Sequence, residues 1–167
     1  MTLNEGIGIP RVKVIKDEEF LRYARAILAR TQKSVLIGTY KFELSERSDA
    51  QDLNSLVRIL FTLANNKVSV RVLLNVTGRR SGLTRINERT GRILQKNGLQ
   101  VRYLPDNRCQ HAKFLIVDDS LAIIGSHNWS PKSVTENLEL SVVLNDPGEV
   151  SEVKRHFERV WGTSKEL

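Results

Sequence analysis

Hydrophobic positions along this chain follow two patterns, a helical period of about 3.6 residues and short runs that are almost continuously apolar. The helical period predicts helices over about 17–31, 48–66, 84–97 and 146–162. The apolar runs predict strands over about 34–40, 68–76, 99–104, 111–117, 121–128 and 138–144. Strands and helices alternate over the first hundred residues, which favours parallel pairing with helical crossovers, whereas three successive strands near the end favour antiparallel pairing.

This order of elements predicts an α/β fold with one mixed central β-sheet that is flanked by helices on both faces. A chain of 167 residues is long enough to bury a hydrophobic core, and we expect a single domain over residues 1–167. Residues 1–12, which include two glycines and a proline, are expected to be flexible.

Composition argues against several classes of protein. The apolar runs are far shorter than the roughly 20 residues that span a bilayer, and the first residues lack the apolar core of a secretory signal. A single cysteine, Cys109, excludes an internal disulfide and disfavours a structural zinc site. We therefore expect a cytoplasmic protein with no metal or other cofactor and no stable membrane association.

Positive charge is concentrated in one segment of the chain. The formal net charge is +7, and residues 77–113 alone hold nine basic and two acidic side chains. A clustered basic surface suits a polyphosphate, because each neutralised phosphate releases condensed counterions. A solvated helix face would produce the same charge run, so the segment indicates a nucleic-acid backbone only if it lies beside a site.

The stretch HAKFLIVDDSLAIIGSHN is typical of a β-hairpin with polar residues at its open end. A two-residue turn at 119–120 would place His111 opposite Asn128 and Lys113 opposite Ser126. Side chains two positions apart share one face of a strand, so these four polar groups would converge on one patch. Such a set suits an oxyanion such as phosphate, with the histidine as nucleophile or proton carrier.

These residues also match a family signature. The pattern H-x-K-x4-D is followed after six residues by G-S-x-N, and the positions are His111, Lys113, Asp118, Gly125, Ser126 and Asn128. The combination resembles the signature of the phospholipase D superfamily, and its single copy is most similar to the short dimeric endonuclease-type members. The resemblance implies a phospholipase D-like half-domain that acts as a metal-independent phosphodiesterase.

Roles for the motif residues follow from this resemblance. His111 is expected to be the nucleophile that forms a covalent phosphohistidine. Lys113 and Asn128, helped by Ser126, are expected to clamp the phosphate and stabilise its developing negative charge. Gly125, without a side chain, is expected to allow a close approach of the substrate to the backbone.

Two acidic positions complete the implied site. Glu136 is expected to hydrogen-bond the other ring nitrogen of His111 and fix its tautomer, with Glu139 as its rival. Asp118 lies at the hairpin turn, away from the open end, so we expect an architectural role for it near the site.

A phosphohistidine route needs two histidines, one to attack and one to protonate the leaving oxygen. The chain carries one copy of the motif, and neither His127, which should point to the opposite face of its strand, nor His156 on the last helix is a good second catalyst. Short single-motif members of the family form dimers with the two-fold axis through the active site. We therefore expect a homodimer in which His111 of each chain serves one shared centre.

The leading hypothesis for the substrate is DNA or RNA, cleaved by an endonuclease with little sequence preference. Candidate substrate-binding residues are the arginines of the basic segment and a tryptophan beside the motif, which could stack on a base or an acyl group but is more often a core residue: Arg79, Arg80, Arg85, Arg108 and Trp129. One alternative is a hydrolase or transferase of phospholipids such as phosphatidyl lipids or cardiolipin. A second alternative is a non-catalytic nucleic-acid-binding module.

Overall fold

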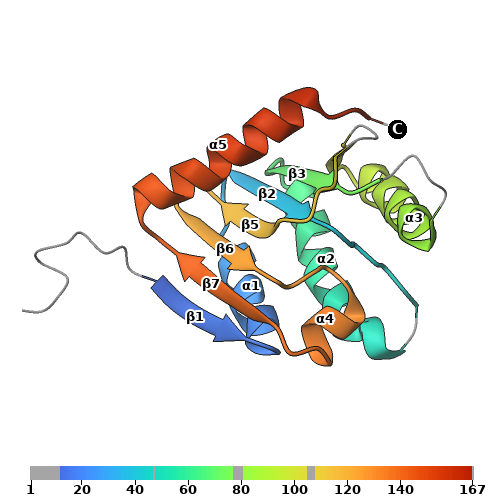
Figure 1. Ribbon diagram of the computed structural model, residues 1–167, viewed down its shortest axis with the longest axis horizontal. Coiled ribbons are helices and arrows are strands. Elements are labelled where there is room, and N and C mark those ends of the chain that lie inside the picture. Colours follow the sequence, from blue (N-terminus) through green and yellow to red (C-terminus); the bar gives the residue numbers. More distant parts are fainter. Residues whose placement is uncertain (1–11, 47, 77–80, 105–107, 167) are drawn as a thin grey trace, which may run out of the picture.

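The computed structural model describes residues 12–46, 48–76, 81–104 and 108–166 (Figure 1). The strands are β1 (Val12–Lys16), β2 (Ser34–Thr39), β3 (Ser69–Leu74), β4 (Gln100–Tyr103), β5 (Lys113–Val117), β6 (Leu121–Gly125) and β7 (Leu140–Leu144). The helices are α1 (Glu19–Leu28), α2 (Gln51–Asn65), α3 (Gly82–Lys96), α4 (Pro131–Thr135) and α5 (Pro147–Thr163), and a 3₁₀ turn (Ser48–Ala50) precedes α2.

The strands form one mixed sheet in the order β1-β7-β6-β5-β2-β3-β4. Strands β2, β3 and β4 pair in parallel, as expected for strands joined by helical crossovers. Antiparallel pairs join β2 to β5, β5 to β6, β6 to β7 and β7 to β1. The predicted α/β fold with a mixed central sheet is confirmed.

Helices cover both faces of this sheet, which is also as predicted. The larger core lies on one face, where α1, α2, α3 and α4 pack against residues such as Ile37, Val72 and Leu115. On the other face α5 alone packs through Phe157 against Leu36 and neighbouring strand residues (Figure 1). Because both faces of the central strands are buried, these strands are apolar at nearly every position.

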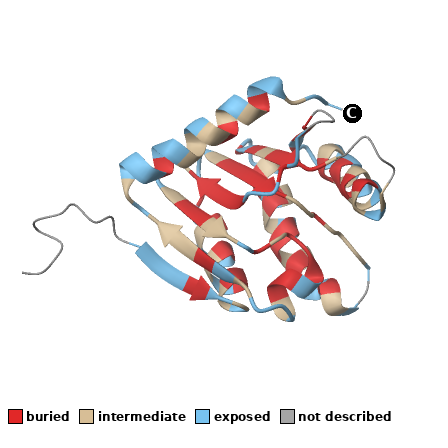
Figure 2. Ribbon diagram, viewed as in Figure 1, coloured by how far each residue is buried: buried red, intermediate tan, exposed pale blue. Residues whose placement is uncertain are grey.

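Two elements were missed by the sequence patterns. Strand β1 is short and lies at the edge of the sheet, where only Ile15 of its five residues is buried, so no clear apolar run marks it (Figure 2). Helix α4 spans a single turn after Ser130, too short for a helical period to be visible. Residues 1–11 lie outside the described residues, whereas Val12, expected to be flexible, begins β1.

The expected register of the β5–β6 hairpin is wrong by one residue. Val117 pairs with Leu121 and Lys113 with Gly125, so the loop holds three residues rather than two. Asp118 and Asp119 both adopt positive φ values, 50° and 56°, a conformation that aspartate tolerates better than most residues. The extra loop residue is Asp118, which is held by another part of the chain instead of pairing with β6.

Helix α5 leaves the outer end of its sheet face uncovered. Val12 and Val14 of β1 are about half exposed, at 48% and 50%, and Leu140 of β7 is 59% exposed. Leu138, just before β7, is 93% exposed. None of the helices in the described part of the chain combines the length and the apolar character that crossing a membrane requires.

Candidate active site at one edge of the sheet

Polar side chains gather at one end of the strands, where β2 and β6 finish and β5 and β7 begin. Strands β2 and β6 run toward this edge, whereas their antiparallel neighbours β5 and β7 start from it. Thr39 ends β2, Lys113 begins β5, and Asn128 and Glu139 lie in the connection from β6 to β7. The sheet pairing therefore brings together residues that are up to a hundred positions apart in the chain.

His111 and Lys113 form the centre of this cluster. The His111 side chain is exposed, and the Lys113 ammonium lies 3.1 Å from its Nδ1 and 3.4 Å from its Nε2. Lys113 Nζ also donates to the carbonyl oxygen of His111 at 2.6 Å. The ring of Tyr40 packs against the imidazole at 4.9 Å between centroids, and it lies 5.4 Å from the Lys113 ammonium.

Lys113 is a cation in an unusually buried position. Its side chain lies at the sheet end with 8% of the residue exposed. Burial lowers the pKa of the Lys113 ammonium below its ordinary value, and electrostatic interactions with the nearby Cys109 and Glu139 offset part of this effect. A partly desolvated cation interacts strongly with an anion that reaches it, because little water screens the charges.

Asn128 is held by the chain that follows β2. Its Oδ1 accepts hydrogen bonds from the backbone N–H of Lys41 at 3.1 Å and from the hydroxyl of Thr39 at 3.4 Å. Its own backbone N–H donates to the hydroxyl of Ser133 at 2.8 Å. No described residue accepts a hydrogen bond from the Nδ2 of Asn128, so this amide is available as a donor to a ligand.

Glu139 is the acidic side chain that is built into the site. Its carboxylate accepts hydrogen bonds from the hydroxyls of Ser126 and Ser133 and from the amide of Asn137. Burial alone would raise the pKa of Glu139, but these hydrogen bonds outweigh it and hold the pKa below its ordinary value. Glu136, by contrast, is exposed where α4 ends. Among the hydrogen bonds of the described residues, neither glutamate binds the His111 ring, whose side-chain partner is Lys113.

Two further expectations are corrected at this edge. The Ser126 hydroxyl donates to Glu139 and accepts from the Leu140 N–H, so it holds the carboxylate rather than presenting a free donor to a phosphate. A Cβ on Gly125 would lie 2.1 Å from the Ser141 hydroxyl and 2.4 Å from the Leu140 carbonyl oxygen. The close approach that Gly125 allows is therefore that of strand β7, not that of a substrate.

Asp118 fastens the hairpin turn to the start of β2. Its carboxylate accepts three backbone hydrogen bonds of 2.7–2.9 Å, from Gln32, Lys33 and Ser34. Burial raises the pKa of Asp118, but the three hydrogen bonds outweigh this effect, so the pKa lies below its ordinary value. The turn is at the opposite end of β5 from Lys113, and this geometry is that of an architectural residue.

Trp129 and His127 both point away from the ligand-accessible edge. Trp129 is 1% exposed and packs against Phe42 and Phe20, so the expectation that it stacks on a base or an acyl group is wrong. His127 is 2% exposed, stacks on Phe20, and is hydrogen-bonded to the Ser141 hydroxyl and the Asp17 carbonyl oxygen. Both side chains stabilise the core behind the site.

The predicted basic residues are only partly described. Arg79 and Arg80 lie outside the described residues. Arg85 is exposed on α3, where it lines a shallow groove with Arg89, Arg92 and Lys96 of the same helix. Arg108 is exposed before β5 and lines a separate pocket with Cys109, His156 and Arg159.

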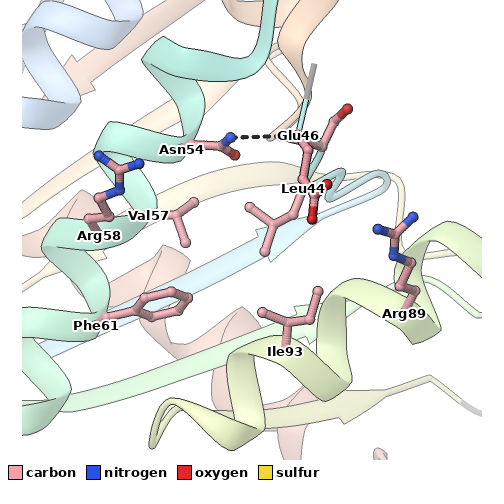
Figure 3. Close-up of a pocket in the computed structure, with 9 residues that line it drawn as sticks. Leu44, Glu46, Asn54, Val57, Arg58, Phe61, Arg89 and Ile93 are labelled. Carbon is pink, nitrogen blue, oxygen red and sulfur yellow. Dashed lines mark hydrogen bonds between the residues drawn. The ribbon is translucent and has the colours of Figure 1, made fainter. Parts of the chain in front are cut away.

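A third hollow lies between α2 and α3 and is shown in Figure 3. Its lining is apolar at Leu44, Val57, Phe61 and Ile93 and charged at Glu46, Arg58 and Arg89. It shares no residue with the cluster around His111. Within the described ranges, no three His, Cys, Asp or Glu side chains gather as they would around a metal ion.

Several residues of the cluster were not expected from the sequence. Thr39 ends the buried strand β2 and Tyr40 follows it. The carboxyl end of a parallel strand is a place where ligand-contacting residues are often found, so the sequence did carry a signal for these two residues. Ser133 belongs to the one-turn helix α4, and nothing in the local pattern marks its hydroxyl. The choice between Glu136 and Glu139 as the acidic residue of the site also could not be made from the local sequence, because their positions depend on where α4 ends.

Comparison with known proteins extends these observations. Residues 24–161 match the family described as "Cardiolipin synthase, PLD-like domain". The mouse protein named mitochondrial cardiolipin hydrolase is 38% identical over 69 residues, which make up 41% of this chain and 31% of that protein. This chain thus matches less than a third of the length of that relative.

The fold is similar to two solved structures. Nuc, a phospholipase D family member from Salmonella typhimurium, is 21% identical with a TM-score of 0.76, over 95% of this chain and 99% of Nuc. NucT from Helicobacter pylori is 16% identical with a TM-score of 0.72, over 94% of this chain and 99% of NucT. With the family match over most of its length, and with His111, Lys113, Ser126 and Asn128 of the motif at one end of the sheet, the chain belongs to the phospholipase D-like (PLD-like) domain family.

Proposed function

We propose that this protein is a metal-independent endonuclease that cleaves DNA or RNA with little sequence preference through a covalent phosphohistidine. The observation that carries the proposal is the pair of His111 and Lys113. An exposed imidazole lies within 3.1 Å of a mostly buried ammonium, beside the free amide donor of Asn128. A nucleophile next to a cation and a neutral donor is the arrangement that in-line attack on a phosphodiester requires.

Each residue has a defined part in the proposed reaction. A neutral ring nitrogen of His111 attacks phosphorus, a P–N bond forms, and the P–O bond to the leaving oxygen breaks. Lys113 and the Asn128 amide hydrogen-bond the non-bridging oxygens, whose negative charge grows in the transition state. Water then attacks phosphorus, the P–N bond breaks, and His111 is regenerated. Glu139 acts next to these groups as a fixed negative charge that favours the charged form of Lys113.

The leaving oxygen needs a proton, and we propose that a second copy of the chain supplies it. His127 is buried behind the site, and His156 lies on α5, where it contacts Arg159 at 3.0 Å. Neither is placed to donate a proton at His111. In a symmetric dimer, His111 of the second copy would protonate the leaving oxygen and then accept the proton of the attacking water.

Nucleic acid is favoured as the substrate by the basic groove on α3. Four basic residues line this groove on one side of the helix, and all four are exposed: Arg85, Arg89, Arg92 and Lys96. The helix begins at the sheet edge that carries the site, because it follows β3, which is parallel to β2. A polyanion bound at His111 could therefore continue along α3.

The test is cleavage of labelled single-stranded and double-stranded DNA and RNA in excess EDTA, by the wild type and by His111→Ala. Cleavage by the wild type that survives EDTA and is lost in the variant is the expected result. A phosphohistidine trapped by acid quench and mapped to His111 would identify the intermediate. Absence of cleavage by the wild type on all four substrates would overturn the nuclease proposal.

A second candidate function is hydrolysis of a phospholipid such as cardiolipin. It is favoured by the name of the curated relatives and by the exposed Leu138 and Leu140 on either side of Glu139. The same chemistry would apply, with a lipid phosphate at His111. Release of phosphatidate from cardiolipin vesicles, with no cleavage of nucleic acid, would decide for this function.

A further inference from the structure

We propose that Asn87 of α3 is a positioning residue that fixes both the nucleophile and the phosphate clamp of the active site. Asn87 does not belong to the motif, and its side chain does not contact His111, Lys113 or Asn128 directly. It is 0% exposed, although a carboxamide in a core is unfavourable unless its hydrogen bonds are made. This inference rests on the proposed phosphodiesterase function of the same site.

Three backbone groups from two strand ends meet on this one side chain. The Oδ1 of Asn87 accepts a hydrogen bond from the Phe42 N–H at 2.9 Å. Its Nδ2 donates to the carbonyl oxygens of Tyr40 at 2.8 Å and of Asn75 at 2.6 Å. Both amide protons are thus used, and α3 is tied to the chain that leaves β2 and to the chain that leaves β3.

The segment after β2 links Asn87 to the active site. Asn87 holds the segment 40–42 at both ends, at the Tyr40 carbonyl and at the Phe42 N–H. Between these two bonds, the Lys41 N–H donates to the Oδ1 of Asn128 and so sets which way its Nδ2 points. The Tyr40 ring packs against the imidazole of His111. A shift of this segment would therefore move the clamp and the nucleophile together.

The chain after β3 reaches His111 by a second path. The Oδ1 of Asn75 accepts a hydrogen bond from the backbone N–H of Gln110 at 3.0 Å, and the Gln110 side chain donates to the Ala112 carbonyl oxygen at 3.1 Å. These bonds enclose His111 on both sides along the chain. Asn75 and Gln110 are 0% and 4% exposed, so water does not compete for their hydrogen bonds.

The same helix offers a matched control one turn further on. Thr90 is 2% exposed, and its hydroxyl accepts a hydrogen bond from the Leu44 N–H at 3.3 Å. Leu44 lines the hollow between α2 and α3 rather than the active site (Figure 3). Thr90→Val therefore removes a buried bond from α3 to the same loop without touching residues 40–42.

The experiment compares Asn87→Asp with Thr90→Val on bis(p-nitrophenyl) phosphate at a temperature where circular dichroism shows both to be folded. An aspartate keeps the shape but cannot donate to the two carbonyl oxygens. We expect kcat to fall about 100-fold in Asn87→Asp with KM changed less than about threefold, since small displacements of reacting groups have effects of this size. Thr90→Val should keep the wild-type kcat. If Asn87→Asp does not fold, Asn87→Ser removes the carboxamide without burying a charge.

A second measurement separates this inference from the proposed function. The ring signals of His111 in ¹H–¹³C NMR spectra should shift in the Asn87 variant and stay in place in Thr90→Val, whatever the substrate is. An inactive wild type with this pattern of shifts would contradict the function and support the positioning role. Unmoved His111 signals, or equal kcat in the two variants, would overturn the inference.

Discussion

At the level of single residues, Glu139 is the carboxylate that hydrogen bonds fix beside the site. Three donors converge on its carboxylate, and its negative charge favours the charged form of the buried Lys113. Glu136, three positions earlier, is exposed. The two glutamates are therefore a natural pair of test and control variants.

We expect Glu139→Gln to lower kcat/KM about 100-fold. Glutamine cannot accept all three hydrogen bonds that hold the connection carrying Asn128, and a small displacement of a group that positions substrate has effects of this size. Burial lowers the pKa of Lys113, and the charge of Glu139 is one of the influences that oppose it. Glutamine removes this charge, so the pKa of Lys113 falls further and the alkaline loss of activity moves to lower pH. Rate measurements over pH 6–10 would check both effects. Glu136→Gln should behave as the wild type, and an equal loss in this control would contradict the assignment.

His127 makes a second prediction at the residue scale, for stability rather than activity. Burial lowers the pKa of His127 below its ordinary value, and the Asp17 carbonyl and two carboxylates only partly offset this. Below about pH 6.5, the usual histidine pKa, the unfolded chain binds a proton that the folded chain does not, so stability falls as pH falls.

Urea unfolding at pH 7.5, 6.5 and 5.5 should therefore show a decreasing free energy of unfolding for the wild type, by at most about 1.4 kcal/mol per pH unit for each proton. His127→Gln should be less stable at pH 7.5 but lose less on acidification. His156, whose pKa is also lowered by burial and by Arg159, contributes in the same direction. If the dependence of stability on pH is unchanged in His127→Gln but flattened in His156→Gln, the effect comes from His156 and the prediction for His127 is wrong.

At the scale of elements, most of the fold could be predicted because burial leaves a clear pattern. The central strands are apolar on both faces, and α1, α2, α3 and α5 each carry an apolar stripe. What could not be predicted depends on contacts between distant parts of the chain. The hairpin register is one residue off because Asp118 is drawn out of the ladder by residues 32–34, which lie more than eighty positions away.

The site shows the same division between local and distant causes. His111, Lys113 and Asn128 were named from their spacing and from the family signature, since the motif lies within one hairpin and its flanks. Glu139, Tyr40 and Asn87 enter through sheet pairing and helix packing, which no local pattern records. Trp129 was named as a candidate substrate contact because it follows Asn128, with a core position as the more common alternative, and the Phe42–Trp129 contact between loops shows that it is a core residue.

Helix α3 carries the prediction that belongs to this scale. If nucleic acid runs along its basic groove, Arg85→Gln with Arg89→Gln should lower the slope of log affinity against log salt by about two, because about one counterion is released per phosphate contact. Binding by the His111→Ala background, measured by fluorescence anisotropy at several salt concentrations, would show this without cleavage.

The control residues for this prediction are two arginines of α1, on the opposite side of the molecule from α3. Helix α1 packs near β1, and α3 near β4, which are opposite edges of the sheet. Arg22 and Arg25 of α1 are exposed, at 72% and 48% of their side chains. Arg22→Gln with Arg25→Gln removes the same charge, so an equal change of slope in this pair would show that net charge, not the groove, is responsible.

At the scale of the whole molecule, one chain supplies one of the two His111 side chains that the proposed reaction needs, and an uncovered apolar surface lies next to it. Leu138 and Leu140, on either side of Glu139, are among the most exposed large apolar side chains of the described residues. Exposed apolar groups beside a site are typical of an interface with another molecule. A second copy of the chain would cover this surface and bring its own His111 to the shared centre.

Subunit mixing tests this arrangement directly. If each active centre needs His111 from two chains, a dimer of one wild-type and one His111→Ala chain is inactive, because either the nucleophile or the proton donor is missing. After denaturation and refolding of an equal mixture, about one quarter of the dimers would be active, against about one half of the chains if each acted alone. Activity at constant total protein should therefore follow the square of the wild-type fraction.

The exposed leucines are the surface on which the proposed second copy would bind. Leu138→Glu places a charge on the proposed interface, so it should shift the concentration at which dimers form, measured by sedimentation, and lower activity most at high dilution. Thr62→Glu, at an exposed position near the end of α2, is the control and should change neither. Activity that stays linear in the wild-type fraction, in a protein that sediments as a monomer, would mean that one chain carries the whole reaction. A proton donor other than a second His111 would then have to be sought within the chain itself.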